Sequence, residues 1–275
     1  MKINQIVGNK HLDDNLVRSN YIDIHCHCLP GIDDGPATMP EAISLCRALV
    51  DNGISIAVAT PHQLGRYSGC NDAEDIRQAV LDLNQELKNK KIELEVVAGA
   101  EVRVDEMICQ LLGKDNLLTL ADGGKFILLE FPHEIFIDIT PLLIDLGSMG
   151  ITAIISHPER HPGLVRKPEV LSKWLRFPAH LQVTAGSLLG DFGKDAEKFA
   201  WQLLSSGQVA VVATDCHNLR KRKPRIRAAF ERISDRLGKT AAQLVCIENP
   251  LKIVKGKDIE TPYSLIKDPA GWSLV

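Results

Sequence analysis

The chain carries seven short apolar runs rich in β-branched residues, and stretches with helical periodicity separate them. The runs cover residues 21–27, 55–62, 94–102, 125–132, 152–157, 181–185 and 209–217. Helices are expected over 40–51, 72–91, 138–149, 168–175, 194–206 and 224–237, with 240–247 and 250–255 closing the chain. Strands that alternate with helices and carry few charges predict a parallel sheet buried on both faces.

Polar residues end nearly every one of these strands, which bears on whether the sheet is open or closed. An open, doubly wound sheet normally places its site at one crevice, whereas the C-terminal rim of a barrel collects residues from every strand. We therefore expect an α/β fold, a distorted TIM-like (β/α)7 barrel one unit short of eight. This domain would span residues 21–255, after an arm of residues 1–20 and before a tail of residues 256–275.

Composition narrows the class of protein. A chain of 275 residues that is 45% hydrophobic fits one large domain. The net charge of −3 gives no argument for nucleic acid or a membrane surface. No apolar stretch approaches the ~18 residues of a membrane span, and the first twenty residues do not resemble a signal peptide. The seven cysteines are odd in number and lack paired CxxC spacing, so we expect reduced thiols in a cytoplasmic protein.

The first apolar run ends in His25-Cys-His27. Side chains alternate along a strand, so the two imidazoles are expected on one side and Cys26 and Cys28 on the other. Two imidazoles side by side at a strand end are suited to bind a metal ion. A metal role for the two cysteines is the alternative, but their position favours packing between strand and helix as small hydrophobic residues.

Further metal-type ligands follow the other strands, and Asp215-x-His217 repeats the alternation of the first pair. The candidates are Asp33, Asp34, His62, Glu101, Glu130, His157, Asp215 and His217. A mixture of imidazole and carboxylate suits Zn, Mn or Fe in hydrolysis better than structural zinc. The ligands are too many for one ion, so we expect two or three. His11, His161 and His180 are interpreted as surface residues, and His133 as a rim residue that could contact substrate.

These strand ends resemble the signature of the PHP superfamily of metal-dependent phosphoesterases: an HxH start, a TPH, a glutamate, a later histidine and a terminal DxH. Within it, the chain is similar to bacterial tyrosine-protein phosphatases of the CpsB/CapC type, which occur with capsule and exopolysaccharide genes. The resemblance covers about residues 21–255. Its phrases are IDIHCHCLPGIDDG, VATPH, GAEVR, LLEFP, ISHPER, QVTAGSLLGDFG and ATDCHN.

The resemblance implies a barrel of the PHP type with three divalent metal ions, of which manganese is favoured and iron or zinc are alternatives. By matching position, the first ion would bind His25, His27, Glu101 and Asp215. The second would bind Glu101, Glu130 and His157, and the third Asp34, His62 and His217. The family pattern favours Asp34 over Asp33. Arg160 and Arg222 match arginines that contact phosphate.

The residues agree with this chemistry, because metal ions and arginines together stabilise a dianionic phosphoryl group. Cys216 and Arg222 have the Cys-x5-Arg spacing of cysteine-dependent phosphatases. However, the residues between them lack the glycines of an anion-binding loop, so a cysteine nucleophile is disfavoured. Arg66 and Tyr67 could contact substrate, although the loop Gln-Leu-Gly-Arg-Tyr departs from the family sequence there. The basic stretch 220–227 is interpreted as a solvated helix entry or a lip that attracts acidic phosphopeptides.

The resemblance implies dephosphorylation of the tyrosine-rich tail of a membrane-bound bacterial tyrosine kinase, with control of polysaccharide assembly. No nucleic acid and no membrane insertion are expected, and a homo-oligomer stays open. One alternative is a PHP phosphomonoesterase acting on a small metabolite such as histidinol phosphate or a sugar phosphate. A second alternative is a metal-binding regulatory scaffold without turnover.

Overall fold

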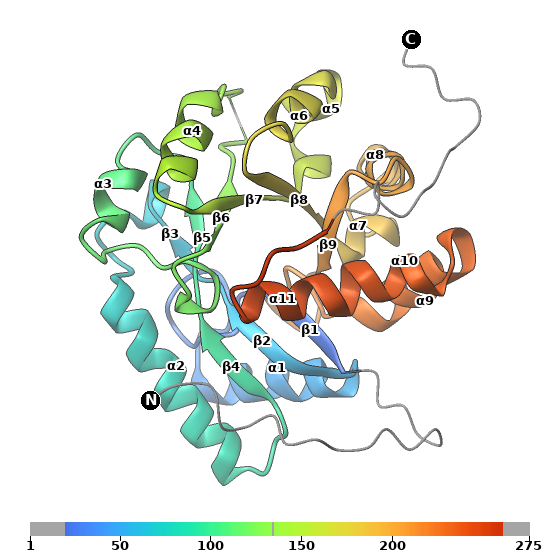
Figure 1. The fold of residues 1–275 in the computed structure, drawn as a ribbon. Helices are drawn as coiled ribbons and strands as arrows, with labels where there is room; N and C mark the ends of the chain where they lie inside the picture. Colours follow the sequence, from blue (N-terminus) through green and yellow to red (C-terminus); the bar gives the residue numbers. More distant parts are fainter. Residues whose placement is uncertain (1–19, 134, 261–275) are drawn as a thin grey trace.

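The computed structural model describes residues 20–133 and 135–260. Nearly all of the expected arm, with His11, and residues 261–275 of the expected tail lie outside these ranges. In the described part, parallel strands form a ring and helices cover its outer side (Figure 1). The prediction of an α/β fold with parallel sheets is confirmed. None of the described helices is long and apolar enough to cross a membrane.

The strands form two parallel sheets, of order β1-β2-β4 and β3-β5-β6-β7-β8-β9. The seven expected runs correspond to nine described strands because the second and third runs are each broken in two. The strands are β1 (Tyr21–Cys26), β2 (Ile54–Ala59), β3 (His62–Gln63), β4 (Glu95–Ala98), β5 (Glu101–Arg103), β6 (Phe126–Glu130), β7 (Thr152–Ser156), β8 (Ala179–Thr184) and β9 (Val209–Ala213).

The two breaks have local causes. Pro61 has no N–H to continue the ladder between β2 and β3. Gly99 separates β4 from β5, and a Cβ atom there would lie 2.6 Å from Cγ1 of Val58. Beyond the breaks, His62 pairs with Glu101 in the six-stranded sheet. The breaks therefore distort the barrel while bringing two candidate ligands into register.

The barrel closes between β1 and the segment after β9. The N–H of His27 donates to the carbonyl of Cys216 at 2.9 Å, and the N–H of Asp215 donates to the carbonyl of His25 at 2.8 Å. A single parallel bridge joins Cys26 to Cys216. The first and last strands of the sequence are thus neighbours, and their polar ends meet.

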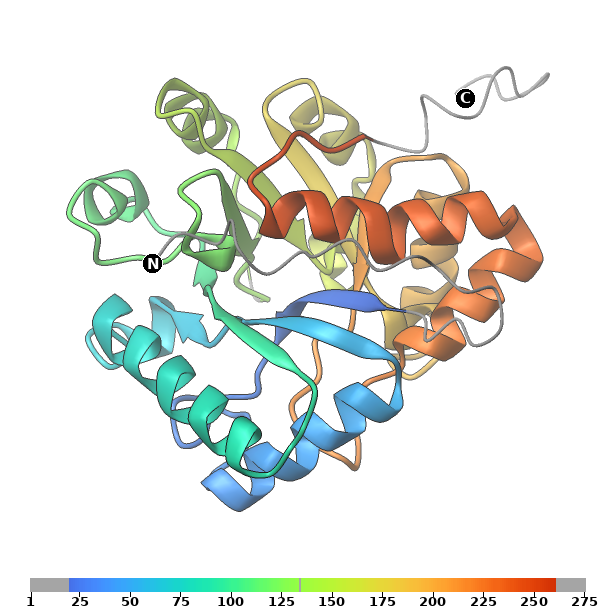
Figure 2. The same ribbon diagram turned by 60° about the horizontal axis from the view of Figure 1, so that its bottom comes forward.

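Helices cover the outside, with α1 and α2 next to the three-stranded sheet (Figure 2). They are α1 (Met39–Asp51), α2 (Ala73–Asn89), α3 (Ile108–Leu112), α4 (Thr140–Ser148), α5 (Pro162–Arg166), α6 (Glu169–Trp174), α7 (Ala185–Leu188), α8 (Lys194–Ser205), α9 (Ile226–Leu237), α10 (Lys239–Gln243) and α11 (Asn249–Val254). A π-helical turn, Leu244–Glu248, joins the last two, so the expected gap between the closing helices is absent. Ile253 of α11 packs with Ile22 and Phe126 and closes the N-terminal end of the barrel interior.

A β-bulge in β1 decides which side chains face the site. Asp23 pairs with Ala57 and Cys26 with Ala59, so β1 has one residue more than β2 in this interval. Ile24 packs in the interior cluster of the barrel. His25 also reaches across the interior, where its Nδ1 lies 2.9 Å from Oε1 of Gln182 in β8. The bulge therefore places a layer of polar side chains directly above the apolar interior.

Candidate metal centre

Glu101 lies at the middle of the polar layer. Its Oε2 is 3.3 Å from Nε2 of His25 and 3.4 Å from Nε2 of His27. The same oxygen is 3.3 Å from Nδ1 of His62, and Oε1 is 2.8 Å from Nε2 of His157. The side chain is 1% exposed. One buried carboxylate thus contacts four histidines from three different strand ends.

Three further groups surround this centre. Oε2 of Glu130 is 3.7 Å from Nδ1 of His62. Oδ1 of Asp215 is 3.2 Å from Nε2 of His25, and His157 belongs to the same group. On the outer side, Oδ1 of Asp34 is 3.4 Å from Nε2 of His62 and 3.3 Å from Nε2 of His217. The structure therefore brings together the nine residues that the resemblance implies as ligands: His25, His27, Asp34, His62, Glu101, Glu130, His157, Asp215 and His217.

Two of these residues have left-handed backbones. His157 follows β7 with φ 31°, and Asp215 follows β9 with φ 50°. Non-glycine residues in this region are strained by about 1–3 kcal/mol and concentrate at functional sites. The conformation turns the chain at each strand end and directs both side chains toward His25.

The neighbours Asp33 and Asp34 have different partners. Oδ2 of Asp33 lies 2.6 Å from Nδ1 of His27 and accepts a hydrogen bond from the N–H of His62. Its Oδ1 accepts from the N–H of Gly35. Asp34 faces His62 and His217 instead. Asp33 therefore orients the ring of His27 through its Nδ1 atom, whereas Asp34 belongs to the outer group of ligand atoms.

The chemistry of the donor atoms fits cations. The Nδ1 atom of His25 faces a carbonyl oxygen and that of His27 faces a carboxylate, so these nitrogens carry the protons. Their Nε2 atoms lie 3.3 Å apart and both face Glu101. Against the effect of burial, Asp33 and Glu101 raise the pKa of His27 well above its usual value, so a cation bound there would replace a proton on Nε2. Oδ1 of Asp215 has no hydrogen-bond partner among the described residues. Converging lone pairs and carboxylate oxygens in a buried space are stabilised by a divalent cation.

Burial and mutual charge shift the pKa values in this cluster. Burial disfavours ionisation of Glu101, but His25 and His157 outweigh it and hold the pKa of this carboxyl well below its usual range. Asp215 is held low in the same way by Arg160, His25 and Arg222, against the effect of burial. Burial and the charge of Arg160 lower the pKa of His157 to about 3. Glu101 and Asp215 are therefore ionised and His157 is neutral at pH 7, the states that bind metals.

Arg160 and Arg222 lie at the edge of the centre and share one acceptor. Nη1 of Arg160 is 2.6 Å and Nη2 of Arg222 is 2.5 Å from Oδ2 of Asp215. Nη1 of Arg222 also lies 2.8 Å from Nε2 of His217. The Nε atoms of both arginines are buried and have no hydrogen-bond partner within the described ranges. Both guanidinium groups thus border the centre, and each keeps an unused N–H donor.

Arg66 and Tyr67 lie on the outer side of the centre. Nη2 of Arg66 is 3.1 Å from Oδ2 of Asp34, and the Tyr67 ring stacks on His62 with 5.4 Å between centroids. Arg66 also donates to the Tyr67 hydroxyl. Both side chains are close enough to the centre to meet a bound substrate, and this role stays a prediction.

Two histidines interpreted as surface residues are less exposed than expected, because His161 is buried and His180 is half-buried. His161 is 4% exposed and caps α5, where its Nδ1 accepts from the N–H groups of Gly163 and Leu164. His180 lies within β8 rather than in a preceding loop, and burial lowers its pKa to about 4. His133 is exposed and lines a cleft beside the centre. Sequence spacing does not show these environments because they depend on distant segments.

The two cysteines beside the first histidine pair pack in the hydrophobic core, as expected. Cys26 and Cys28 are both fully buried. The Sγ atoms of Cys26 and Cys216 lie 3.4 Å apart. Cys216 is thus buried in the same hydrophobic core.

Three residues that support the site were not predicted from the sequence. Asp23 is fully buried and accepts hydrogen bonds from the N–H and hydroxyl of Thr214, which ties β1 to the end of β9. Gln182 orients His25, and the Ser156 hydroxyl donates to Glu101 at 2.8 Å. A carboxylate inside the apolar run 21–27 was the available signal for Asp23. Gln182 and Ser156 carried no comparable signal.

Comparison with known proteins places this site in a family. Residues 21–255 match the model of the family described as capsular polysaccharide synthesis, CpsB/CapC. The tyrosine-protein phosphatase YwqE of Bacillus subtilis is 38% identical over 207 residues, which cover 73% of this chain and 79% of YwqE. The tyrosine-protein phosphatase CpsB of Streptococcus agalactiae is 30% identical over 241 residues, which cover 85% of this chain and 98% of CpsB.

Solved structures agree with the sequence matches. Crystal structures of YwqE from Bacillus subtilis and CpsB from Streptococcus pneumoniae, described as unique metal-dependent tyrosine phosphatases, include a chain that matches with a TM-score of 0.84. That match has 33% identity and covers 88% of this chain and 97% of the other. A lactonase from Listeria monocytogenes matches with a TM-score of 0.56 at 12% identity, which shows a shared fold alone. This chain therefore belongs to the CpsB/CapC family.

Proposed function

We propose that this chain is a metal-dependent protein-tyrosine phosphatase. The observation that carries the proposal is the convergence of nine ligand-type side chains around Glu101, with two arginines at its edge. YwqE and CpsB, which match over most of their length, are tyrosine-protein phosphatases. Family membership and site chemistry therefore support the same reaction, hydrolysis of a phosphate monoester.

Three divalent cations are proposed, with manganese favoured. His25, His27, Glu101 and Asp215 would hold the first, Glu101, Glu130 and His157 the second, and Asp34, His62 and His217 the third. The groups of mutually close ligand atoms support the first and third sets. For the second set they join Glu130 to Glu101 and His62, whereas His157 lies with His25 and Asp215. Bound cations would supply Lewis-acid charge to the phosphoryl oxygens and to a water molecule.

The protein's own contribution is charge and orientation. Arg160 and Arg222 can donate bidentate hydrogen bonds to the phosphoryl oxygens as negative charge develops. The neutral His157 and the ionised Glu101 keep their states because the pKa values lie far below 7. Asp33 and Gln182 fix the ring orientations of His27 and His25.

The proposed substrate is the phosphotyrosine tail of a membrane-bound bacterial tyrosine kinase that controls capsule or exopolysaccharide assembly. The description of the matching family, capsular polysaccharide synthesis, supports this setting. A cytoplasmic location follows from such a substrate, because kinase tails carry their phosphate in the cytoplasm. The domain division into residues 1–20, 21–255 and 256–275 belongs to the same proposal.

The test compares turnover of a phosphotyrosyl peptide by the manganese-loaded protein with turnover by His27→Ala and Asp215→Ala. Each substitution should lower kcat/KM by more than about a hundredfold, because it removes a ligand. Equal activity in all three proteins would contradict the proposal. Histidinol phosphate and sugar phosphates in the same panel distinguish a metabolite phosphatase, and absence of any turnover points to a scaffold.

A further inference from the structure

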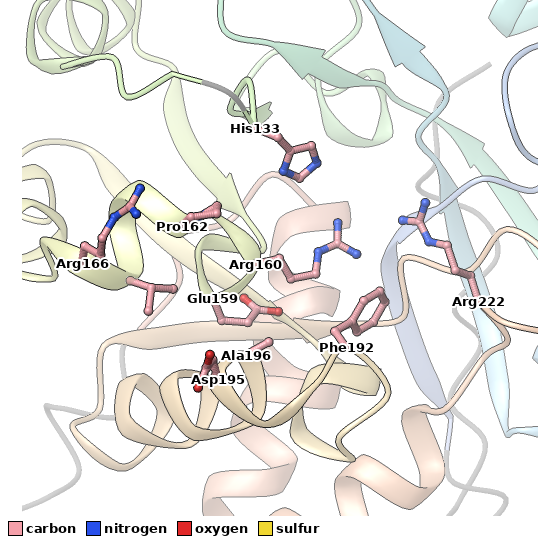
Figure 3. A pocket seen from close by; sticks show the side chains of 10 residues that line it. His133, Glu159, Arg160, Pro162, Arg166, Phe192, Asp195, Ala196 and Arg222 are labelled. Carbon is pink, nitrogen blue, oxygen red and sulfur yellow. The ribbon is translucent and has the colours of Figure 1, made fainter.

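A cleft of about 600 Å³ lies beside the metal centre, and the proposed phosphatase reaction assigns no role to it (Figure 3). Arg160 and Arg222 form its inner end. Phe192, Pro162 and Val165 supply apolar surface to its walls. The cleft thus begins at the groups that would hold a phosphate and continues along apolar side chains.

The size and lining of the cleft fit an aromatic group. A cavity of about 150 Å³ holds a benzene ring, so this cleft has room for a ring and for atoms of a neighbouring residue. Ligand sites commonly combine apolar walls with a few placed polar groups. Exposed charges of both signs, on Arg166 and Asp195, lie at the cleft as well. They suit the polar backbone and side chains of a peptide.

Arg160 and Gly186 define the position of the Phe192 ring. The guanidinium carbon of Arg160 lies 4.7 Å from the centroid of the Phe192 ring. Gly186 leaves the space that the ring occupies, because a Cβ atom at Gly186 would lie 3.0 Å from Cε2 of Phe192. In the view of Figure 3, the ring lies between the side chains of Arg160 and Arg222. The phrase QVTAGSLLGDFG therefore positions one aromatic ring next to the phosphate-binding arginines.

We propose that this cleft is the aryl subsite of the enzyme: it receives the ring of a phosphotyrosine and the adjoining peptide, with Phe192 as a specificity-determining residue. The inference rests on the proposed function and adds the place where the substrate's ring binds. Phosphate held by Arg160 and Arg222 puts the attached ring against Phe192. An alkyl phosphate, such as phosphoserine, leaves the apolar wall uncovered and gains less binding free energy.

The test separates ring binding from phosphate binding. The probes are a peptide with phosphonomethyl-phenylalanine, which is not hydrolysed, and inorganic phosphate, each titrated calorimetrically into the manganese-loaded protein. Phe192→Leu keeps apolar volume but removes ring stacking, and should weaken the peptide probe roughly three- to tenfold. The affinity for inorganic phosphate should stay unchanged. Ala196→Leu, which fills the cleft from the buried start of α8, should have the same selective effect.

The matched control is Phe230→Leu, which removes a ring that packs on Tyr21 outside the cleft. It should change neither affinity. Equal losses for both probes in Phe192→Leu would overturn the subsite and leave Phe192 as a support for Arg160. A selective loss in Tyr67→Leu with none in Phe192→Leu would overturn it too, and place the ring beside His62. If the native protein binds the peptide probe but does not hydrolyse phosphotyrosine, the proposed function fails while the subsite stands.

Discussion

Oδ2 of Asp33 lies 2.6 Å from Nδ1 of His27, so the carboxylate fixes the ring with its Nε2 toward Glu101. Supporting carboxylates of this kind commonly change metal affinity by about 10- to 100-fold. We expect Asp33→Ala to weaken manganese binding by about this factor, measured by titration calorimetry. The control is Asp82→Ala, an exposed carboxylate on α2. Unchanged affinity in Asp33→Ala would exclude this orienting role.

Asp34 should behave differently from its neighbour, because its carboxylate faces His62 and His217 directly. Asp34→Ala is expected to lower the number of ions per chain by one, whereas Asp33→Ala at saturating manganese keeps the full number. Elemental analysis of the two saturated proteins measures this difference. The same ion count in both variants would remove Asp34 from the proposed ligand set.

Arg222 and Cys216 provide a test between metal-dependent and cysteine-dependent chemistry. Arg222→Ala should lower kcat for a phosphotyrosyl peptide by about 10²- to 10³-fold, since it removes a donor to the phosphoryl oxygens. Cys216→Ala should keep kcat/KM within about tenfold, because its buried thiol packs against Cys26 and attacks nothing. Steady-state kinetics of both variants measure this. Abolished turnover in Cys216→Ala, with native metal content, would favour a cysteine nucleophile.

His180 should make stability depend on pH. Burial lowers the pKa of this imidazole from 6.5 to about 4, so the unfolded chain binds the proton more tightly between these values. Stability is therefore unaffected above pH 6.5 and is lost as pH falls toward 4, by up to about 3 kcal/mol. Its Nδ1 has no hydrogen-bond partner in the described part of the chain.

Replacing His180 by Leu removes this proton-binding group. Urea unfolding of the metal-free proteins at pH 7 and pH 4 gives the comparison, because the other titrating groups contribute equally to both. Between these pH values, the free energy of unfolding should fall by up to about 3 kcal/mol more in the native protein than in the variant. Equal losses of unfolding free energy in the two proteins would show that protonation of His180 does not destabilise the fold.

Gly99→Ala should destabilise the barrel, since the added Cβ would lie 2.6 Å from Cγ1 of Val58. Overpacking of this kind costs about 1–3 kcal/mol. Gly113→Ala is the matched control, because its backbone has φ −64° and its nearest contact would be 3.5 Å away. Urea unfolding should show a large loss for Gly99→Ala and little change for Gly113→Ala. Equal stability of the two variants would mean that β2 and β4 separate easily.

Much of the fold and site followed from local pattern. The alternation of apolar runs and helices predicted the parallel barrel, and residues that end strands predicted the ligand layer. The breaks at Pro61 and Gly99 were not expected, because a continuous apolar run does not show where a strand changes sheet. The strained backbones of His157 and Asp215 also need the surrounding structure to hold them.

Local sequence was enough to predict which ligand types stand at the strand ends, since parallel strands bring their carboxyl ends to one rim. Tertiary structure alone decided their partners. The bulge after Asp23 directs His25 toward Gln182, and Asp33 supports His27 while Asp34 joins the outer group. It also buried His161 and left His180 half-buried within β8. These outcomes depend on contacts between segments far apart in the chain, where small changes in register decide which atoms meet.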